Sequence, residues 1–259
     1  MKIRYYIVLF FLIIKFSDSH AQKSYSVSVT EFIFSYSDVE FSEAFYSEYP
    51  QAEISKSNVR FTAFLHISQE WHLDFTNNIG IITGLGLRNI GLISDEMLPD
   101  MDDNNRMINY KIIRRLYTLG VPLAVKLGSF KNHIFIYFGG EAELGLHYKE
   151  KYWTNTHSRD GDKSINTTWL GEQTPLFLPS VYGGIQLPKG INIRVKYYLN
   201  DFLNRNYSTG RNTNEFNISD LTRYKTAQVY YLALSWQFDT SYDSKKKWDP
   251  RKEVVANRK

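Results

Sequence analysis

The 259-residue sequence contains no cysteine, only seven prolines and, beyond its first residues, no long hydrophobic run. The lack of cysteine excludes a disulfide-stabilised mini-domain and a thiol for lipid attachment. Without a later run of about 20 apolar residues, a protein that spans a membrane with helices is excluded as well. The formal net charge is only +4 at pH 7, so nothing in the charge suggests a nucleic-acid-binding protein.

Aromatic residues, in contrast, are abundant. The chain has 19 tyrosines and 17 phenylalanines, and 43% of its residues are hydrophobic. Aromatic side chains are typical of β-strands, and the mean hydropathy of −0.37 is too polar for a bundle of membrane helices. The composition therefore predicts a chain built largely of strands.

The one uninterrupted apolar stretch lies at the start of the chain. Met1–Arg4 is basic, Tyr5–Ile14 is apolar, and Ser19–Ala21 has the small-x-small form that signal peptidase cleaves. We expect residues 1–21 to be a signal peptide and the protein to be exported. A membrane anchor is the alternative, disfavoured because the run is short and Lys15 follows it.

The clearest strand pattern lies in a predicted hairpin. From Ile191 to Asn200 apolar and polar residues alternate, which is typical of a strand whose two faces meet different environments. A turn at Pro188–Gly190 joins it to an earlier strand, Phe177–Leu187. In a soluble protein the apolar face would need a second layer to cover it.

Similar alternation predicts eight strands in all. They cover residues 25–36, 59–67, 79–88, 107–127, 133–147, 177–187, 191–200 and 223–238. The connections between them are alternately long and short, and the long ones include an acidic loop, 94–106, and polar loops at 149–174 and 201–221. Short periplasmic turns, long extracellular loops and apolar-out alternation are typical of outer-membrane barrels.

The expected fold class is therefore all-β: an eight-stranded antiparallel transmembrane β-barrel of residues 22–238 in the outer membrane. A charged periplasmic tail, residues 239–259, would follow it. A secreted soluble sandwich or lipocalin-like barrel, with its apolar side chains pointing inward, is the competing interpretation.

Two stretches resemble a known family. Leu119–Leu127 (LGVPLAVKL) and Tyr231–Phe238 (YLALSWQF), together with the strand pattern, resemble the small outer-membrane β-barrel family often labelled PorT-like, which is akin to the OmpA and OmpX barrels. The resemblance implies an accessory role in a protein-secretion or envelope assembly, with a protein partner bound through the loops or the tail.

The last strand also resembles the assembly signal that the barrel-insertion machinery reads during biogenesis. The residues that carry this likeness are Tyr231, Ala233, Trp236 and Phe238. Ala233 stands where glycine is usual, and the segment lies inside the chain, so the likeness is partial.

The interior of an eight-stranded barrel is just wide enough for side chains to fill it. The predicted inward residues include many cations and two carboxylates: Arg60, Arg88, Arg114, Lys126, Arg194, Lys196, Arg223 and Lys225, with Glu141 and Glu143. We interpret them as a charge network that plugs the lumen. The excess of cations leaves a narrow pore for small anions as the alternative.

No catalytic site, cofactor or metal site is expected. Glu141 and Glu143 lie side by side on one strand, which favours structural pairing over acid–base catalysis. His66, His133 and His147 are predicted inward at different heights, without the spacing of metal ligands. An outer-membrane lipid-modifying enzyme is the third alternative, with His147 as its one candidate residue.

Overall fold

The computed structural model describes residues 23–54, 59–154, 159, 162–210 and 216–239. The predicted signal peptide and residues 240–259 of the predicted tail lie outside these residues. Within them, no helix is long and apolar enough to cross a membrane.

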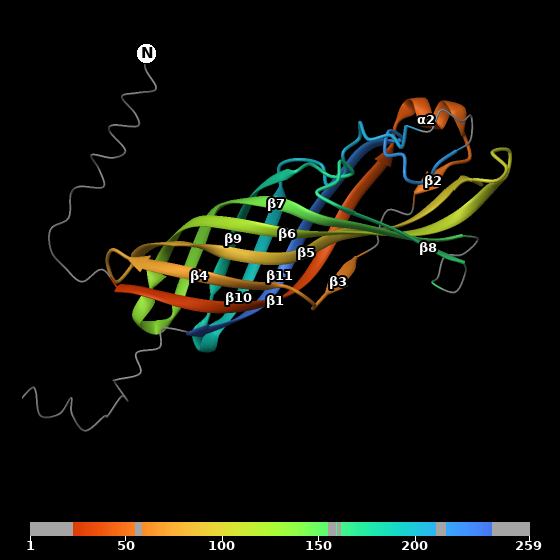
Figure 1. Cartoon of the computed structure of the whole chain (residues 1–259). Coiled ribbons are helices and arrows are strands. Elements are labelled where there is room, and N and C mark those ends of the chain that lie inside the picture. Colours follow the sequence, from red (N-terminus) through yellow and green to blue (C-terminus); the bar gives the residue numbers. More distant parts are fainter. Residues whose placement is uncertain (1–22, 55–58, 155–158, 160–161, 211–215, 240–259) are drawn as a thin grey trace, which may run out of the picture.

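Long antiparallel strands form a closed ring (Figure 1). In chain order they are β1 (Lys23–Phe41), β4 (Ile67–Asp74), β5 (Ile79–Pro99), β6 (Met107–Ser129), β7 (Ile134–Thr154), β9 (Phe177–Gln186), β10 (Ile191–Tyr198) and β11 (Tyr224–Asp239). Each pairs with the next along the chain, and β11 pairs with β1 from Asp239 opposite Val27 to Tyr224 opposite Phe41. The pairing of β11 with β1 therefore closes the ring.

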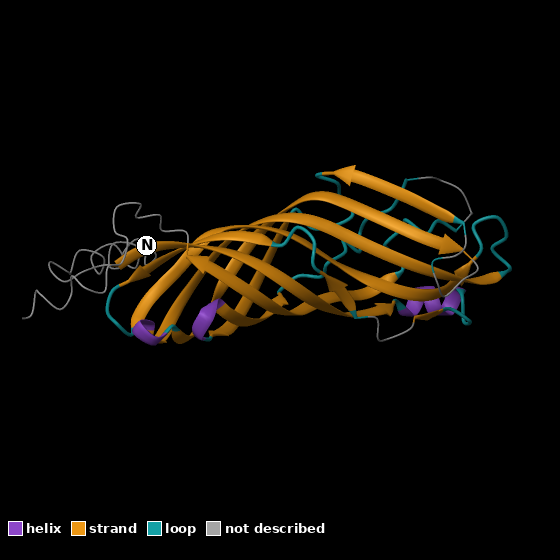
Figure 2. Cartoon of the chain, turned by 90° about the horizontal axis from the view of Figure 1, so that it is seen from below, coloured by secondary structure: helices purple, strands orange, loops and turns teal. Residues whose placement is uncertain are grey.

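Shorter elements attach to the ring. They are α2 (Glu43–Glu48), β2 (Glu53–Ile54), β3 (Arg60–Thr62), β8 (Lys163–Trp169) and the 3-10 turns η1 (Phe130–Asn132) and η2 (Pro188–Gly190). α2, β2 and β8 lie at one end of the barrel, and the two 3-10 turns lie at the other (Figures 1 and 2). In η2, Lys189 and Gly190 both adopt positive φ, 65° and 81°, which is a conformation that glycine accepts without strain.

The prediction of a strand at residues 59–67 is wrong. Only Arg60–Thr62 is a strand, which pairs with β1, and Leu65 follows it with a φ of 58°. The ring strand β4 begins at Ile67 and runs through the segment that was expected to be a connection. Apolar and polar residues alternate in both segments, so the pattern alone could not tell which one enters the ring.

Two of the predicted loops are partly strand. β5 continues to Pro99 and pairs there with Met107 of β6, so the acidic loop shortens to residues 100–106. β7 continues to Thr154 and β8 pairs with it, which places strand within the loop expected at 149–174. The outward positions of these strand ends include charged residues, Asp95 on β5 and Lys149 and Lys151 on β7.

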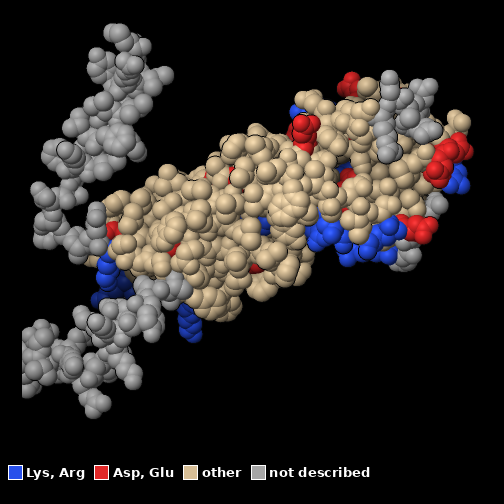
Figure 3. All heavy atoms as spheres, in the orientation of Figure 1, with Lys and Arg blue, Asp and Glu red and all other residues tan. Residues whose placement is uncertain are grey.

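The outer surface nearer the 3-10 turns is apolar on every ring strand, and we call this zone the apolar band. Its exposed side chains are Phe32, Ile67, Trp71, Ile79, Leu85, Leu119, Val121, Leu123, Val125, Leu127, Ile134, Ile136, Phe138, Phe177, Val181, Ile191, Val195, Tyr197, Leu232, Leu234, Trp236 and Phe238. Few charged atoms appear on this part of the wall in Figure 3. Behind the band, the inward positions are mainly polar or charged.

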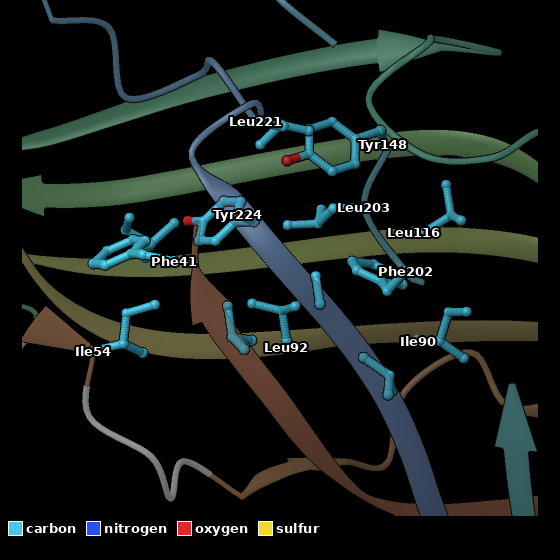
Figure 4. Packing of buried hydrophobic residues seen from close by; sticks show 14 of the residues in the cluster. Phe41, Ile54, Ile90, Leu92, Leu116, Tyr148, Phe202, Leu203, Leu221 and Tyr224 are labelled. Atoms are coloured by element: carbon cyan, nitrogen blue, oxygen red, sulfur yellow. The ribbon is translucent and has the colours of Figure 1, made fainter. Parts of the chain in front are cut away.

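Beyond the band, toward α2 and β8, the two faces exchange character, and we call this part the extension. Its inward side chains form an apolar core that includes Ile90, Leu92, Ile112, Leu116 and Tyr148 (Figure 4). Outward positions on the same strands include Asp95, Lys111 and Arg115. The extension thus has an apolar core of its own and charged residues on its outer face.

The connection from β10 to β11 folds into the extension. Phe202, Leu203, Ile218 and Leu221 are at most 1% exposed and pack in the same core. The backbone N–H of Phe202 donates to the carbonyl of Ala227 on β11 at 2.8 Å. The described residues of this predicted loop, 201–210 and 216–221, therefore pack into the extension, and we call them the packed cap.

Candidate functional site: the buried charge clusters

A cluster of ion pairs, the band cluster, fills the barrel behind the apolar band. It contains Glu31 on β1, Glu70 on β4, Arg88 on β5, Glu141 and Glu143 on β7, and Arg194 and Lys196 on β10. Each of these side chains is at most 1% exposed. They come from five strands. Each points into the lumen because successive side chains of a strand alternate between its two faces.

Two arginines connect strands that are not neighbours in the ring. Arg194 donates from Nη1 to Glu31 Oε1 at 2.8 Å and from Nη2 to Glu70 Oε1 at 2.7 Å. Arg88 donates from Nε to the other oxygen of Glu31 at 3.0 Å and from Nη1 to Glu141. Glu31 is therefore held between two guanidinium groups.

Lys196 completes the cluster on the β7 side. Its ammonium group donates to Glu141 Oε2 at 2.8 Å and to Glu143. The hydroxyl of Tyr198 donates to Glu143 at 3.1 Å. The two glutamates thus share one cation, and their structural role stays a prediction.

Glycines make room for these large side chains. A Cβ at Gly86 would lie 2.8 Å from Nη1 of Arg88, and a Cβ at Gly120 would meet the carboxylate of Glu141. Glycine is otherwise unfavourable inside a strand, so its presence here is explained by the volume that the charged groups need.

Below the band cluster, toward the 3-10 turns, lies a further cation. Lys126 pairs with Asp74 and donates to the hydroxyl of Tyr25 at 2.9 Å. Nδ1 of His72 lies 3.1 Å from the same ammonium, and Nε2 of His72 lies 3.4 Å from Glu70. The polar contacts therefore continue from Lys126 through His72 to the band cluster.

A second group of buried charged residues, the extension cluster, lies in the extension, on the side of the band toward α2 and β8. Glu150 accepts from Arg114 Nε at 2.8 Å, and Arg114 Nη1 donates to the hydroxyl of Tyr224 at 2.9 Å. That hydroxyl donates to Glu96 at 2.7 Å, and Arg223 lies 3.4 Å from Glu96. Burial alone would raise the pKa of Glu96, but Arg223 and Arg114 outweigh it, so the pKa lies below its usual value.

Five of the eight predicted inward cations occupy these clusters and Lys126 adjoins the band cluster, whereas Lys225 and Arg60 differ. Lys225 is 58% exposed on its side chain and faces outward, 3.8 Å from Glu40. The β1–β11 register shifts between Glu40 and Phe41, and Lys225 is the bulged residue of β11. Its side chain therefore points outward instead of into the lumen. Arg60 is buried but hydrogen-bonds the side-chain and backbone oxygens of Asn89, at 2.7 and 3.1 Å, instead of a carboxylate.

The expected excess of inward cations is wrong, because several carboxylates were missed. Glu31, Glu70, Asp74, Glu96 and Glu150 are all at most 7% exposed and pair with the inward cations. Glu31 shares its face of β1 with the apolar Val29 and Ile33, so the sequence pattern did not identify this face as the polar, inward one. Glu70 and Asp74 lie in the segment that was expected to be a connection.

The three histidines lie in different surroundings. His66 is buried and accepts from the backbone N–H of Asn89 at 3.3 Å. His133 is exposed at the η1 turn with a φ of 54°, and His147 faces outward against the ring of Trp169, so the inward prediction is wrong for both. Across the described residues, no group of three His, Asp or Glu side chains could hold a metal ion.

The residues of the predicted assembly signal divide between the two faces of β11. Tyr231 and Ala233 point inward and are buried, whereas Trp236 and Phe238 are exposed in the apolar band. Their role during assembly stays a prediction.

The fold and clusters define a closed barrel with an apolar outer belt and a charged, filled interior. No protein-family model matches the chain, and a search of curated proteins finds no significant match. The PorT-like resemblance therefore stays a prediction.

Among solved structures, similarity is found to Ail, the attachment invasion locus protein of Yersinia pestis, in complex with the heparin analogue sucrose octasulfate. The identity is 12% and the TM-score 0.36, over 84% of this chain and 100% of that chain. Neisserial surface protein A gives 9% identity and a TM-score of 0.35, over 84% and 98%. The outer membrane protein OprG from Pseudomonas aeruginosa gives 10% and 0.27, over 85% and 98%. TM-scores this low support no argument about function.

Proposed function

We propose that this chain is an outer-membrane β-barrel with a plugged lumen, and that it acts by holding its extension at the membrane surface as an interaction module. The observation that carries the proposal is the apolar band, which occupies all strands of the ring. An apolar belt of this extent is far larger than the exposed patches of soluble proteins, and lipid is the one partner that covers it all round.

The length of the band supports a membrane location. On β6 the outward residues from Leu119 to Leu127 are all apolar and exposed, which is a stretch of nine residues. A tilted strand needs about 9–11 residues to cross the hydrocarbon core. Ring closure also satisfies the backbone hydrogen bonds that an open sheet would expose to lipid.

The filled interior favours a structural barrel over the passive pore. Arg88, Arg194, Lys126 and Lys196 are at most 1% exposed, whereas the side chains that line a water-filled channel would be wetted. Cations and carboxylates are also paired across the lumen, so the anion preference has lost its basis.

The interaction role rests on the extension. It has its own apolar core and packed cap, and it carries a surface cavity of about 240 Å³ lined by residues of β1, α2, β2 and β11, among them Glu43 and Tyr46. An accessory role in a secretion or envelope assembly, as the PorT-like resemblance implies, would use such a surface.

The membrane location is tested by expressing the full chain in a Gram-negative host and separating the membranes. The barrel should sediment with the outer membrane, resist extraction by carbonate, and migrate faster on gels before boiling than after it. Recovery as a soluble periplasmic protein would contradict the proposal and favour the lipocalin-like alternative.

The interaction role is tested by mild detergent extraction through an affinity tag after Lys259. A stoichiometric partner should be lost in Glu43→Lys with Tyr46→Ser, and retained in the control Lys131→Gln with Lys189→Gln, which alters the opposite end of the barrel. A barrel that is always extracted alone would contradict the interaction role and leave the membrane location standing.

A further inference from the structure

The outer face of the extension carries a group of basic side chains, which we call the cationic patch. It consists of Arg115 on β6, Lys149 and Lys151 on β7, and Lys163 on β8. Arg115 lies directly opposite Lys149 in the β6–β7 pairing, and Lys163 lies opposite Trp153 in the β7–β8 pairing. Basic atoms gather on this part of the molecule in Figure 3.

In the described part of the chain, the cations of the patch have no carboxylate as an ion-pair partner. Within the described ranges, none of the four forms an ion pair, whereas Lys111 on the same face of β6 pairs with Asp95 at 2.8 Å. Nε of Arg115 is shielded from solvent and has no hydrogen-bond partner among the described residues. Burial, together with the neighbouring cations of the patch, lowers the pKa of Lys151.

The patch borders the apolar band, and aromatic rings lie between the two. On β6 the outward residues run from Leu119 in the band through Tyr117 to Arg115. The ring of His147 lies 5.8 Å from that of Tyr117 and 4.5 Å from that of Trp169, which is 73% exposed. The order apolar, aromatic, cationic matches the order of hydrocarbon, interface and charged headgroups in a bilayer.

We propose that the cationic patch binds the phosphate-bearing headgroup of a lipid in the leaflet on the side of the extension. The inference rests on the proposed function, since insertion of the barrel is what places the patch at the height of the headgroups. A lipid accounts for both halves of the surface: its phosphate would meet the unpaired cations, and its chains would lie on the band below Trp169. A free phosphate ion would leave the aromatic and apolar half unexplained.

The test is a titration of the purified full-length barrel in detergent micelles, followed by native mass spectrometry. The probes are lipid A, phosphatidylcholine and inorganic phosphate. We expect lipid A to bind at least about tenfold more tightly than phosphatidylcholine, and Lys149→Gln with Lys151→Gln to weaken lipid A binding by about tenfold.

The control is Lys111→Gln with Lys225→Gln. It removes the same charge from the same half of the barrel, but both of these lysines have protein carboxylates nearby, Asp95 and Glu40. Its lipid A affinity should change by less than about twofold. Equal weakening by the two double variants would indicate attraction to net charge and would overturn the proposal, as would equal affinity for lipid A and phosphatidylcholine.

Two further readouts separate the possible failures. Displacement of lipid A by millimolar inorganic phosphate would assign the patch to a free anion and overturn the lipid proposal. A barrel that inserts into phosphatidylcholine vesicles but shows no preference for lipid A would overturn this inference alone. A barrel that fails to insert would overturn the proposed function itself.

Discussion

Arg194 neutralises two carboxylates of the band cluster, which come from two other strands. Arg194→Met would leave one oxygen of Glu31 and the carboxylate of Glu70 buried without this cation. We expect the free energy of unfolding to fall by about 3–5 kcal/mol. Urea unfolding in detergent, followed by the heat-dependent gel shift, measures the change, and the exposed Lys225→Met serves as the control.

A rescue variant tests whether charge pairing is the cause. Adding Glu31→Gln and Glu70→Gln to Arg194→Met removes the uncompensated charges, so most of the lost stability should return. A triple variant as unstable as Arg194→Met would show that the volume of the arginine matters more than its charge.

A substitution at Gly120 tests whether the lumen has room for a larger side chain. A Cβ at this position would meet the carboxylate of Glu141, and we expect Gly120→Ala to cost about 1–3 kcal/mol of the free energy of unfolding. Gly140→Ala is the matched control, since its nearest neighbour would be the carbonyl of Ser180 at 3.4 Å. Similar losses for the two variants would contradict the steric explanation.

At the residue scale, strand alternation predicted much of the band cluster. It placed Arg88, Arg194, Lys196, Glu141 and Glu143 inward because their neighbours two positions away share one face. It could not find Glu31, whose inward neighbours Val29 and Ile33 are apolar, or the outward direction of Lys225, which is the bulged residue of β11 against β1. A bulge depends on pairing, and pairing is not visible in one strand's sequence.

At the element scale, the extension cluster predicts a dependence on pH. The pKa of Glu96 is lower in the folded protein than its usual value of 4.5. Glu96 therefore stabilises the fold fully above pH 4.5, and this contribution is lost as the pH falls through the lowered folded pKa. Amide protection factors for residues 110–116 should fall on acidification below about pH 4.5, and Glu96→Gln should show lower protection at pH 7 and a smaller change on acidification. An unchanged pH response in that variant would contradict the assignment.

The packed cap predicts a local effect. Phe202 is 1% exposed in the core of the extension, and Phe202→Ala should cost about 3–5 kcal/mol there while the band cluster stays intact. Increased proteolysis between Asp201 and Leu221, with an unchanged heat-dependent gel shift, would match this expectation. A barrel that loses the gel shift would show that the cap and the band unfold together.

The packed cap is an element that the sequence pattern could not predict. The segment 201–221 is polar, and the four buried residues in its described part have no regular spacing, so the sequence resembled a loop. Likewise, apolar and polar residues alternate equally well in segments 59–67 and 67–74. Which segment pairs with β5 depends on closure of the ring, and that is a property of all the strands together.

For the whole molecule, the filled lumen predicts electrical silence. The full-length barrel in a planar bilayer should give no single-channel steps at neutral pH, because the buried ion pairs of the band cluster occupy the lumen. Regular steps that shrink when Arg194 or Lys196 is neutralised would revive the anion-pore alternative.

The exchange of the two faces between Leu119 and Arg115 has a mechanical consequence. Sliding the barrel by two residues along its strands, about 5 Å along the membrane normal, would either bring Arg115 and Lys149 into hydrocarbon or lift Leu119 into water. Both displacements are unfavourable, so the barrel has one preferred depth. In a bilayer of another thickness the lipid has to stretch or compress around it, and the extension stays at a constant height above the surface.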